Sequence, residues 1–260
     1  MMEFILTESE FNEDNTAWNG NRFLMGNGYF GIRGTLEEYT KKQMCAVNMA
    51  GIYDKMGNSW RESVNAPNPL YTYIKVNGKI YALPDEKPKF HQQELDFRYG
   101  IHSRVTHWQT EHGNITVVCE RFASIARQHN IAMKYTFSVD FDCEAEIITG
   151  IDGDVWDING PHFVKMKIGS KDGADYVTGM TGEKNISVTV KEYIRTDFQA
   201  EQTNQNTDKS IFRHIKFSAK AEKEYIIEKI AEITTSVDDF GTSGSIDELN
   251  YSDLVAEHKV

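Results

Sequence analysis

Apolar and polar residues alternate with a period of two along most of this chain, and that pattern constrains its fold more than any other feature. Turn residues separate the alternating runs at intervals of roughly 8–15 residues. The runs are 71–76, 79–83, 101–109, 115–124, 131–139, 144–151, 186–195, 211–219 and 225–235. Many short strands at this spacing predict an all-β sandwich or barrel rather than a parallel sheet with crossover helices.

Two hairpin turns can be located from the sequence. Asn77-Gly78 stands between two β-rich runs, and this pair favours a type I′ turn, in which both central residues have positive φ. A second hairpin is expected at 111–114, joining the runs 101–109 and 115–124. The polar segment 199–208 is rich in Gln and Asn and is expected to be a solvated loop.

Helical signal is nearly absent before the end of the chain. Ser245 and Glu248 have the spacing of a capping box, in which each side chain satisfies a free backbone N–H. The residues 241–244 read as a linker, so a helix is expected from about 246 and still running at Val260. Its apolar stripe would contain Leu249, Leu254 and Val255. We therefore expect a β-sandwich domain over 1–240, followed over 241–260 by a linker and the start of a helix.

Composition excludes several classes of partner. The 260 residues carry a net charge of −11, whereas binding to nucleic acid or to an anionic membrane needs clustered Lys and Arg. The N-terminus lacks the basic and apolar regions of a signal peptide. No run approaches the ~20 apolar residues of a membrane span. We expect a cytoplasmic protein that binds neither nucleic acid nor a membrane.

The three cysteines, Cys45, Cys119 and Cys143, are far apart in the sequence and odd in number. They do not suggest a disulfide framework or a zinc site. Each stands among alternating apolar residues, so we expect all three to be small buried hydrophobic side chains.

Two motifs resemble ligand-binding loops. The run 26–31 matches GxGxxG, but a dinucleotide site needs a helix to follow, and Gly34-Thr35 opens a helix poorly. A tight turn and strand start are expected there. The segment from Asp152 to Asn159 resembles a calcium loop, yet the twelfth position is Phe163 where an EF-hand needs Glu. A turn whose Asp side chains accept hydrogen bonds from local amides is favoured.

The histidines and carboxylates give no clear catalytic or metal-binding pattern. His102 and His107 are five residues apart on an expected strand and should face opposite sides of the sheet. Because the chain contains no HxH or HxxxH, no metal site is expected. Glu37 and Glu38 with Asp54 suggest a glycosidase acid pair, but surface charge is the favoured interpretation.

One segment, 60–69, combines Trp60 and Arg61 with Asn65, Asn68 and two prolines. A flat aromatic face and amide groups are suited to sugar recognition. A stiff structural loop explains the same composition, and both interpretations stay open.

Several segments together resemble glycoside hydrolase family 65. They are 26–34 (GNGYFGIRG), 50–54 (AGIYD), 65–68 (NAPN), 95–100 (LDFRYG), 121–124 (RFAS) and 150–153 (GIDG), in the order of the family. The family comprises phosphorylases of maltose, kojibiose, nigerose and trehalose, with related hydrolases. The resemblance covers essentially 11–260.

The resemblance implies a large two-sheet, galactose-mutarotase-like β-sandwich (a supersandwich) with a short C-terminal linker helix, followed in the family by an (α/α)6 barrel. That barrel carries the catalytic Glu and the phosphate site, so no catalytic residue is expected in this chain, which alone is expected to be inactive. The parent reaction would be inverting phosphorolysis of an α-glucosyl disaccharide, with phosphate as co-substrate and no cofactor. A homodimer contact and a loop at the active-site rim, formed by Trp60, Asn65 and Asn68, are further expectations.

Two alternatives remain. The first is a stand-alone carbohydrate-binding module. The second is a small enzyme of the mutarotase type, which needs a histidine and a carboxylate in one cleft, for example His129 or His162 with a nearby Glu.

Overall fold

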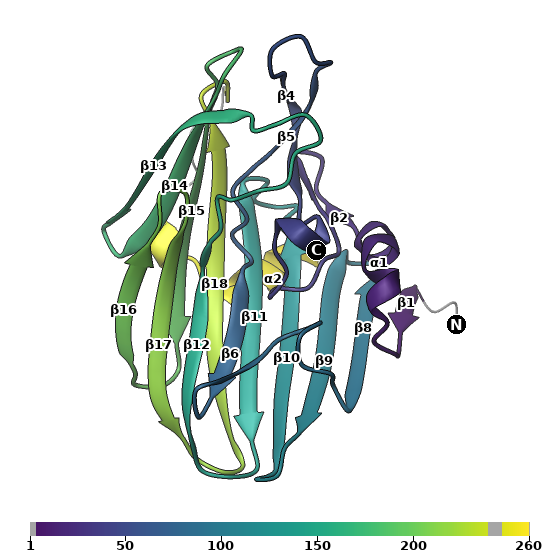
Figure 1. Ribbon diagram of the computed structural model, residues 1–260, viewed down its shortest axis with the longest axis vertical. Helices are drawn as coiled ribbons and strands as arrows, with labels where there is room; N and C mark the ends of the chain where they lie inside the picture. The colour runs from purple at the N-terminus through teal and green to yellow at the C-terminus, as the bar shows by residue number, and fades with distance from the viewer. Residues whose placement is uncertain (1–3, 239–245, 260) are drawn as a thin grey trace.

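Strands dominate the computed structural model, which describes residues 4–238 and 246–259. A nine-stranded and a five-stranded antiparallel sheet face each other, and a four-stranded sheet adjoins them (Figure 1). The all-β sandwich is confirmed, whereas the small third sheet was not expected. Among the described residues, no helix has the length and apolar character needed to cross a membrane.

The strands of each sheet are given below in the order in which they are hydrogen-bonded to their neighbours. The nine-stranded sheet contains β1 (Ile5–Glu8), β8 (Phe90–Asp96), β9 (Ile101–Gln109), β10 (Asn114–Ala123), β11 (Asn130–Val139), β18 (Lys223–Thr235), β15 (Ser187–Thr196), β14 (Ala174–Thr181) and β13 (Phe163–Lys171). The five-stranded sheet contains β16 (Glu201–Asn206), β17 (Ile211–Ala219), β12 (Cys143–Ile151), β6 (Thr72–Val76) and β7 (Lys79–Tyr81). The four-stranded sheet contains β2 (Met25–Gly26), β3 (Phe30–Ile32), β4 (Val47–Asp54) and β5 (Glu62–Asn65).

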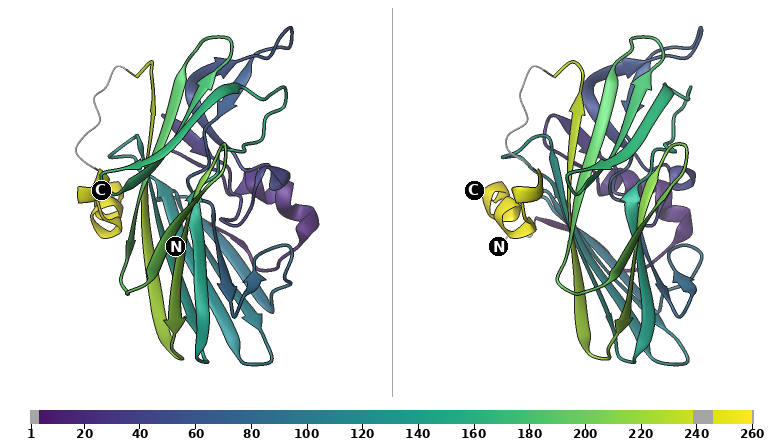
Figure 2. Two further views of the ribbon diagram at one scale, coloured as in Figure 1. Left: turned by 60° about the vertical axis from the view of Figure 1, so that its left-hand side comes forward. Right: turned by 90° about the vertical axis from the view of Figure 1, so that its left-hand side faces the viewer.

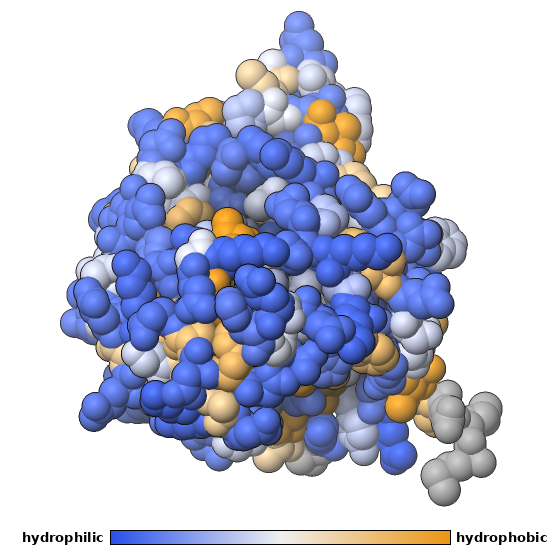
Figure 3. All heavy atoms as spheres, turned by 60° about the horizontal axis from the view of Figure 1, so that its bottom comes forward, coloured by the Kyte–Doolittle hydropathy of each residue, from blue (hydrophilic) through white to orange (hydrophobic). Residues whose placement is uncertain are grey.

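Both predicted hairpins are present. Asn77 and Gly78 join β6 to β7 with φ of 49° and 81°, as a type I′ turn requires. The β9–β10 hairpin turns at 110–113, and Ile115 lies opposite Trp108. Along β10, every second residue from Ile115 points into the core, because the strand alternates between its two faces. Figure 3 shows hydrophilic residues over most of the lower end of the molecule, with apolar residues in small separate areas.

The structure also tests the predictions for the cysteines, the histidines of β9 and the 26–31 segment. All three cysteines are free and buried. His102 is buried, while His107 lies on the opposite face of β9 and contacts Thr116 Oγ1 at 2.8 Å. Asn27 turns the chain between β2 and β3, and its Oδ1 accepts hydrogen bonds from the backbone N–H groups of residues 29 and 30, both at 3.1 Å. The 26–31 segment is a turn, not the start of a helix.

The prediction of a loop at 199–208 is wrong, because Glu201–Asn206 forms β16 at the edge of the five-stranded sheet. All six residues of β16 are exposed. Because the side chains on both faces of β16 are polar, its sequence has no alternation of apolar and polar residues that would predict a strand. Polar side chains are nevertheless typical of an edge strand.

The helices differ from the prediction at both ends of the chain. The short helix α1 (Thr16–Arg22) was not expected; it follows the 3-10 turn η1 (Glu13–Asn15). Near the C-terminus a 3-10 turn, η3 (Ile246–Glu248), precedes α2 (Tyr251–His258). The helix therefore begins at 251 rather than 246, because Asn250 supplies its cap by accepting a hydrogen bond from Asp253 N at 2.9 Å. The expected linker 241–244 and the cap at Ser245 lie outside the described residues.

Helix α2 covers part of the outer face of the nine-stranded sheet, on the side away from the five-stranded sheet (Figure 2). Four residues lie side by side across β9, β10, β11 and β18 and form an apolar row beneath it, namely Ile101, Phe122, Ala132 and Ile230. Tyr251 and Leu254 of α2 are buried on this row, and Leu249 and Val255 pack at its margin. Of the predicted stripe, Leu254 is fully covered.

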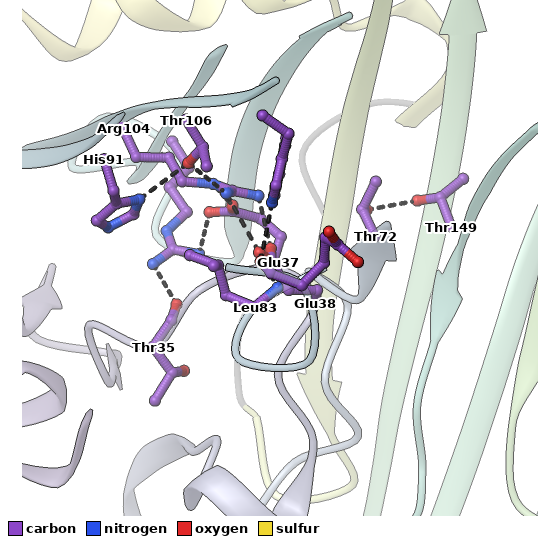
Figure 4. Close-up of polar contacts among 12 residues, drawn as sticks. Thr35, Glu37, Glu38, Thr72, Leu83, His91, Arg104, Thr106 and Thr149 are labelled. Atoms are coloured by element: carbon purple, nitrogen blue, oxygen red, sulfur yellow. Dashed lines mark hydrogen bonds and ion pairs between the residues drawn. The ribbon is translucent and has the colours of Figure 1, made fainter. Parts of the chain in front are cut away.

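A network of buried charges holds the segment between β3 and β4 against the inner face of the nine-stranded sheet (Figure 4). Arg104 Nε lies 2.6 Å from Glu37 Oε2, and Arg104 Nη2 lies 2.5 Å from Glu38 Oε2. Arg121 donates to Glu37 Oε1 and to Thr35 O, both at 2.5 Å. The expectation that Glu37, Glu38 and Asp54 carry surface charge is wrong, since all three are buried. The partners of Glu37 and Glu38 could not be identified from the sequence, because the arginines are more than 60 residues away along the chain.

The electrostatics of this network depend on its burial. Burial raises the pKa of Glu37, but Arg121 and Arg104 outweigh that effect and lower it to about 2. His91 lies beside the network and contacts Thr106 Oγ1 at 2.9 Å. Burial, followed by the nearby positive charge of Arg104, lowers the pKa of His91 to about 3. The folded protein therefore holds Glu37 charged and His91 neutral.

Replacing Arg104 by Met should destabilise the chain strongly, because Glu37 and Glu38 would lose a shared buried partner. We expect a loss of about 3–5 kcal/mol in the free energy of unfolding, measured by urea denaturation. Arg127→Met is the matched control: Arg127 pairs with Glu257 at 2.7 Å near the surface, and its loss should cost about 0–1 kcal/mol. Similar losses in the two variants would contradict the structural role of the buried network.

The stability of the chain should fall as the pH drops from about 6.5 toward 5. An unfolded histidine titrates near 6.5, whereas His91 stays neutral when folded until about pH 3. The unfolded state therefore binds more protons in this window, and His91 contributes up to about 1.4 kcal/mol per pH unit. Urea denaturation of His91→Gln at several pH values should give a shallower slope. An unchanged slope would show that His91 is not the group responsible.

Candidate functional site

The segment 60–69, which stands out in the sequence for its composition, lies against the loop that joins β12 to β13. Asn68 and Asp152 form an isolated antiparallel bridge, with N···O distances of 2.7 and 2.9 Å. The Asn65 side-chain amide donates a hydrogen bond to the backbone carbonyl of Trp156. Figure 1 shows this loop crossing in front of the molecule near β5. The two segments therefore support each other, although about 90 residues separate them in the sequence.

A second contact, which we call the Glu62 clasp, fixes the far end of the loop and consists of Glu62, Asn159 and His162. Glu62 Oε1 accepts a hydrogen bond from Asn159 N at 2.8 Å and pairs with His162 Nε2 at 2.7 Å. Asn159 Nδ2 donates to Glu62 Oε2 at 3.3 Å. Burial raises the pKa of Glu62, but the hydrogen bonds from Asn159 and His162 outweigh it and lower the pKa. An ionised carboxylate thus holds the loop to the start of β5.

The loop forms one wall of a cavity of about 330 Å³. The turn of η2 (Lys41–Gln43) and the turn between β16 and β17 form other parts of its wall. The charged and aromatic side chains that line it are Lys41, Asp154, Trp156, Asp157, Phe163 and Lys209. Its volume lies near the lower end of the range for small-molecule sites.

Asp154 is the electrostatic centre of this cavity. Its carboxylate oxygens lie 2.6 Å from Lys41 Nζ and 2.8 Å from Lys209 Nζ. Partial burial raises the pKa of Asp154, but Lys209 and Lys41 outweigh this and lower it. The neighbouring glycine is sterically required, since a Cβ on Gly153 would lie 2.1 Å from Lys209 O. The acidic loop and the lysine turn can approach closely only with glycine at this position.

The three predicted rim residues have different environments. Asn65 and Asn68 are 3% and 8% exposed. Asn68 Oδ1 accepts a hydrogen bond from Leu70 N at 3.0 Å, so both amides make contacts within the protein. Trp60 is 59% exposed on the β4–β5 connection. The structure thus brings Asn65 and Asn68 together at the β12–β13 loop and leaves Trp60 at the surface.

The calcium-like segment is a turn, as its sequence favoured. Asp152 Oδ1 accepts hydrogen bonds from Asp154 N at 3.0 Å and from Ser210 Oγ at 2.9 Å. Sequence reasoning did not select Trp156 or Phe163, which line the cavity. The signal available for them was an aromatic residue within and just after an Asp- and Gly-rich loop.

One group of potential metal ligands was also missed. Ligand atoms of Glu62, Asp157 and His162 all lie within 4.8 Å of one another. Glu62, however, already accepts three hydrogen bonds from Asn159 and His162. The group fits a hydrogen-bonded clasp better than an ion site, and the expectation of no metal stays a prediction.

The two histidines considered for a mutarotase-like cleft are also placed. His162 does face a glutamate, Glu62, but it is 2% exposed. His129 Nδ1 lies 2.8 Å from Ile233 O, and its ring lies 4.2 Å from that of Tyr29. His129 therefore pairs with a backbone carbonyl rather than with a carboxylate.

Comparisons with known proteins agree on one family. The model of the glycosyl hydrolase family 65 N-terminal domain matches residues 6–260. A nigerose phosphorylase from Lachnoclostridium phytofermentans is 39% identical over 260 residues, which cover 91% of this chain and 34% of that relative. A 1,2-alpha-glucosylglycerol phosphorylase from Bacillus selenitireducens is 36% identical over 221 residues, with coverage of 84% and 29%.

A solved structure shows the same fold. A putative kojibiose phosphorylase from the human microbiome superposes with a TM-score of 0.86 at 19% identity, covering 99% of this chain and 37% of that one. The chain spans about a third of the length of the relatives that it matches. The chain belongs to glycosyl hydrolase family 65 and corresponds to the N-terminal domain of that family.

Proposed function

We propose that this chain is the non-catalytic N-terminal domain of an α-glucoside phosphorylase. The observation that carries the proposal is the similarity to a nigerose phosphorylase, which is 39% identical and covers 91% of this chain. Further relatives are named as phosphorylases of glucosylglycerol and kojibiose. In the proposed organisation, residues 1–240 form the support domain, and 241–260 lead through α2 to an (α/α)6 catalytic domain.

The proposed parent reaction is inverting phosphorolysis of an α-glucosyl disaccharide. A carboxylic acid protonates the glycosidic oxygen while phosphate attacks the anomeric carbon from the opposite face. The C1–O bond to the leaving sugar breaks as the C1–O bond to phosphate forms. The products are glucose and β-glucose 1-phosphate.

The described residues support placing the acid outside this domain. Their five buried glutamates each lie beside a basic or imidazole side chain: Glu37 and Glu38 beside Arg104, Glu62 beside His162, Glu192 beside Lys229 and Glu232 beside Lys191. A general acid must come within about 2.6–3.2 Å of the oxygen that it protonates. Carboxylates that are buried and engaged in this way are poorly placed for that task.

The finer roles are proposals of the same kind. The β-sandwich would provide a packing surface and a homodimer contact, and the protein would act in the cytoplasm. Trp60 would extend from the β4–β5 connection to the rim of the active site, with Asn65 and Asn68 fixing the chain that follows it. A stand-alone carbohydrate-binding module and a mutarotase-type enzyme are less well supported, because neither explains the extended similarity to phosphorylases.

The reaction can be tested on the full-length protein. Incubation with nigerose or kojibiose and phosphate should give β-glucose 1-phosphate, whose β configuration can be assigned by proton NMR because a phosphorylated anomeric carbon does not mutarotate. Without phosphate, turnover should be at least tenfold slower. Phosphate-independent release of glucose would indicate a hydrolase, and formation of the α anomer would exclude inversion.

The rim role has its own test in the same enzyme. Trp60→Ala should lower kcat/KM for phosphorolysis by about tenfold, the effect of losing one packing contact of about 1.4 kcal/mol. Trp18→Ala is the matched control, since Trp18 is 62% exposed on α1, and it should leave kcat/KM unchanged. If kcat/KM is equal in the two variants and the wild type, Trp60 belongs to a structural loop only.

A further inference from the structure

We propose that the cavity at the β12–β13 loop binds a neutral hexosyl unit, independently of the catalytic domain. The inference extends the proposed function: the sugar class follows from it, whereas the site depends only on residues of this chain. The cavity is bounded by the β12–β13 loop, η2 and the β16–β17 turn.

The apolar part of the cavity suits one face of a sugar ring. Trp156 and Phe163 line it together with Met166 and Val155. Pyranose rings present C–H groups on one face and hydroxyls around the edge, so they pack against aromatic side chains while polar groups bind the hydroxyls. Both aromatic residues are only partly buried, and they leave surface available to a ligand.

The charges of the cavity favour a neutral ligand over an ion. Lys41 and Lys209 both pair with Asp154, and Asp157 also lines the cavity, so these four side chains together carry a formal charge of zero. A phosphate would need uncompensated positive charge, and a metal cation would lie beside two ammonium groups. Sugar hydroxyls both donate and accept hydrogen bonds, and therefore match carboxylate acceptors next to ammonium donors.

The cavity wall is held in place before any ligand arrives. The Asn68–Asp152 bridge fixes the start of the β12–β13 loop, and the Glu62 clasp fixes its end. Between them, the hydrogen bond from Asn65 holds the carbonyl of Trp156. A loop ordered in advance loses little conformational entropy on binding, which matters for a weak ligand such as a monosaccharide. The buried polar residues Glu62, Asn65 and Asn68 therefore position the cavity wall.

A second cavity, of about 470 Å³, is less suitable for a sugar ring. It lies between the β6–β7 and β9–β10 turns and is lined by Lys79, Tyr81 and His112. Lys79 Nζ lies 5.0 Å from the centroid of the Tyr81 ring, so an ammonium group already covers that aromatic face. The side chain of His112 is 61% exposed. Phe141 also lines this cavity, but its walls do not include the doubly anchored β12–β13 loop.

The test is calorimetric titration of the 260-residue chain with glucose and nigerose up to about 50 mM, expecting saturable binding with a Kd of about 1–10 mM. Trp156→Ala should weaken binding at least tenfold, and Lys209→Met by about tenfold through loss of one charged hydrogen bond. Trp18→Ala, at a distant exposed tryptophan, should bind as the wild type does. Circular dichroism of each variant establishes that it is folded.

Three results would overturn the proposal: no heat with either sugar, unchanged binding in folded Trp156→Ala, or competition by inorganic phosphate at equal concentration. Failure of the site is distinguishable from failure of the proposed function. If the cavity binds no sugar, the full-length protein still forms β-glucose 1-phosphate at its wild-type rate. If the protein is not a phosphorylase, the titration of the 260-residue chain still measures whether the cavity binds a hexose.

Discussion

The ion pairs that join Arg104 and Arg121 to Glu37 and Glu38 are the contact on which the rest of the structure depends. They connect two adjacent strands of the nine-stranded sheet to the segment between β3 and β4. Desolvating four charges costs several kcal/mol per ion, so the network need not add net stability over an apolar core. Its geometry is directional, however, and it specifies where the segment lies. Lys41 follows Glu38 by three residues, so the same contact also places one wall of the cavity.

The Glu62 clasp applies the same principle at the end of the sandwich. A carboxylate that accepts hydrogen bonds from Asn159 and His162 holds a loop of eleven residues between β12 and β13. Apolar packing alone would hold such a loop less specifically, because Ile158 is exposed. Buried polar contacts thus position surface features in a domain whose strands otherwise provide a uniform scaffold. In the proposed phosphorylase, that scaffold would present loops to the active site while taking no part in bond breaking.

The strands could be predicted closely because alternation and turns are local signals. Asn77-Gly78 specifies its hairpin, and 211–219 matches β17 residue for residue. β16 was missed because its side chains are polar on both faces, and α2 was placed five residues early because Asn250 supplies the cap expected from Ser245. The site was only partly predictable. Asn65 and Asn68 were expected in a loop at the active-site rim or in a stiff structural loop, and they contact the β12–β13 loop, whereas Trp156 was overlooked. Contacts between segments about 90 residues apart leave no local pattern in a single sequence.

In the proposed function this domain supports catalysis without performing it, and turnover by the 260-residue chain alone is the measurement that bears on this most directly. The chain would be assayed at high concentration with α-glucosyl disaccharides and phosphate and, separately, with an α-aldose for anomer exchange. We predict no formation of glucose 1-phosphate and no anomer exchange above the buffer rate. Turnover of either substrate that is abolished by His162→Ala in a folded variant would contradict the inference, and would make the Glu62 clasp a catalytic pair.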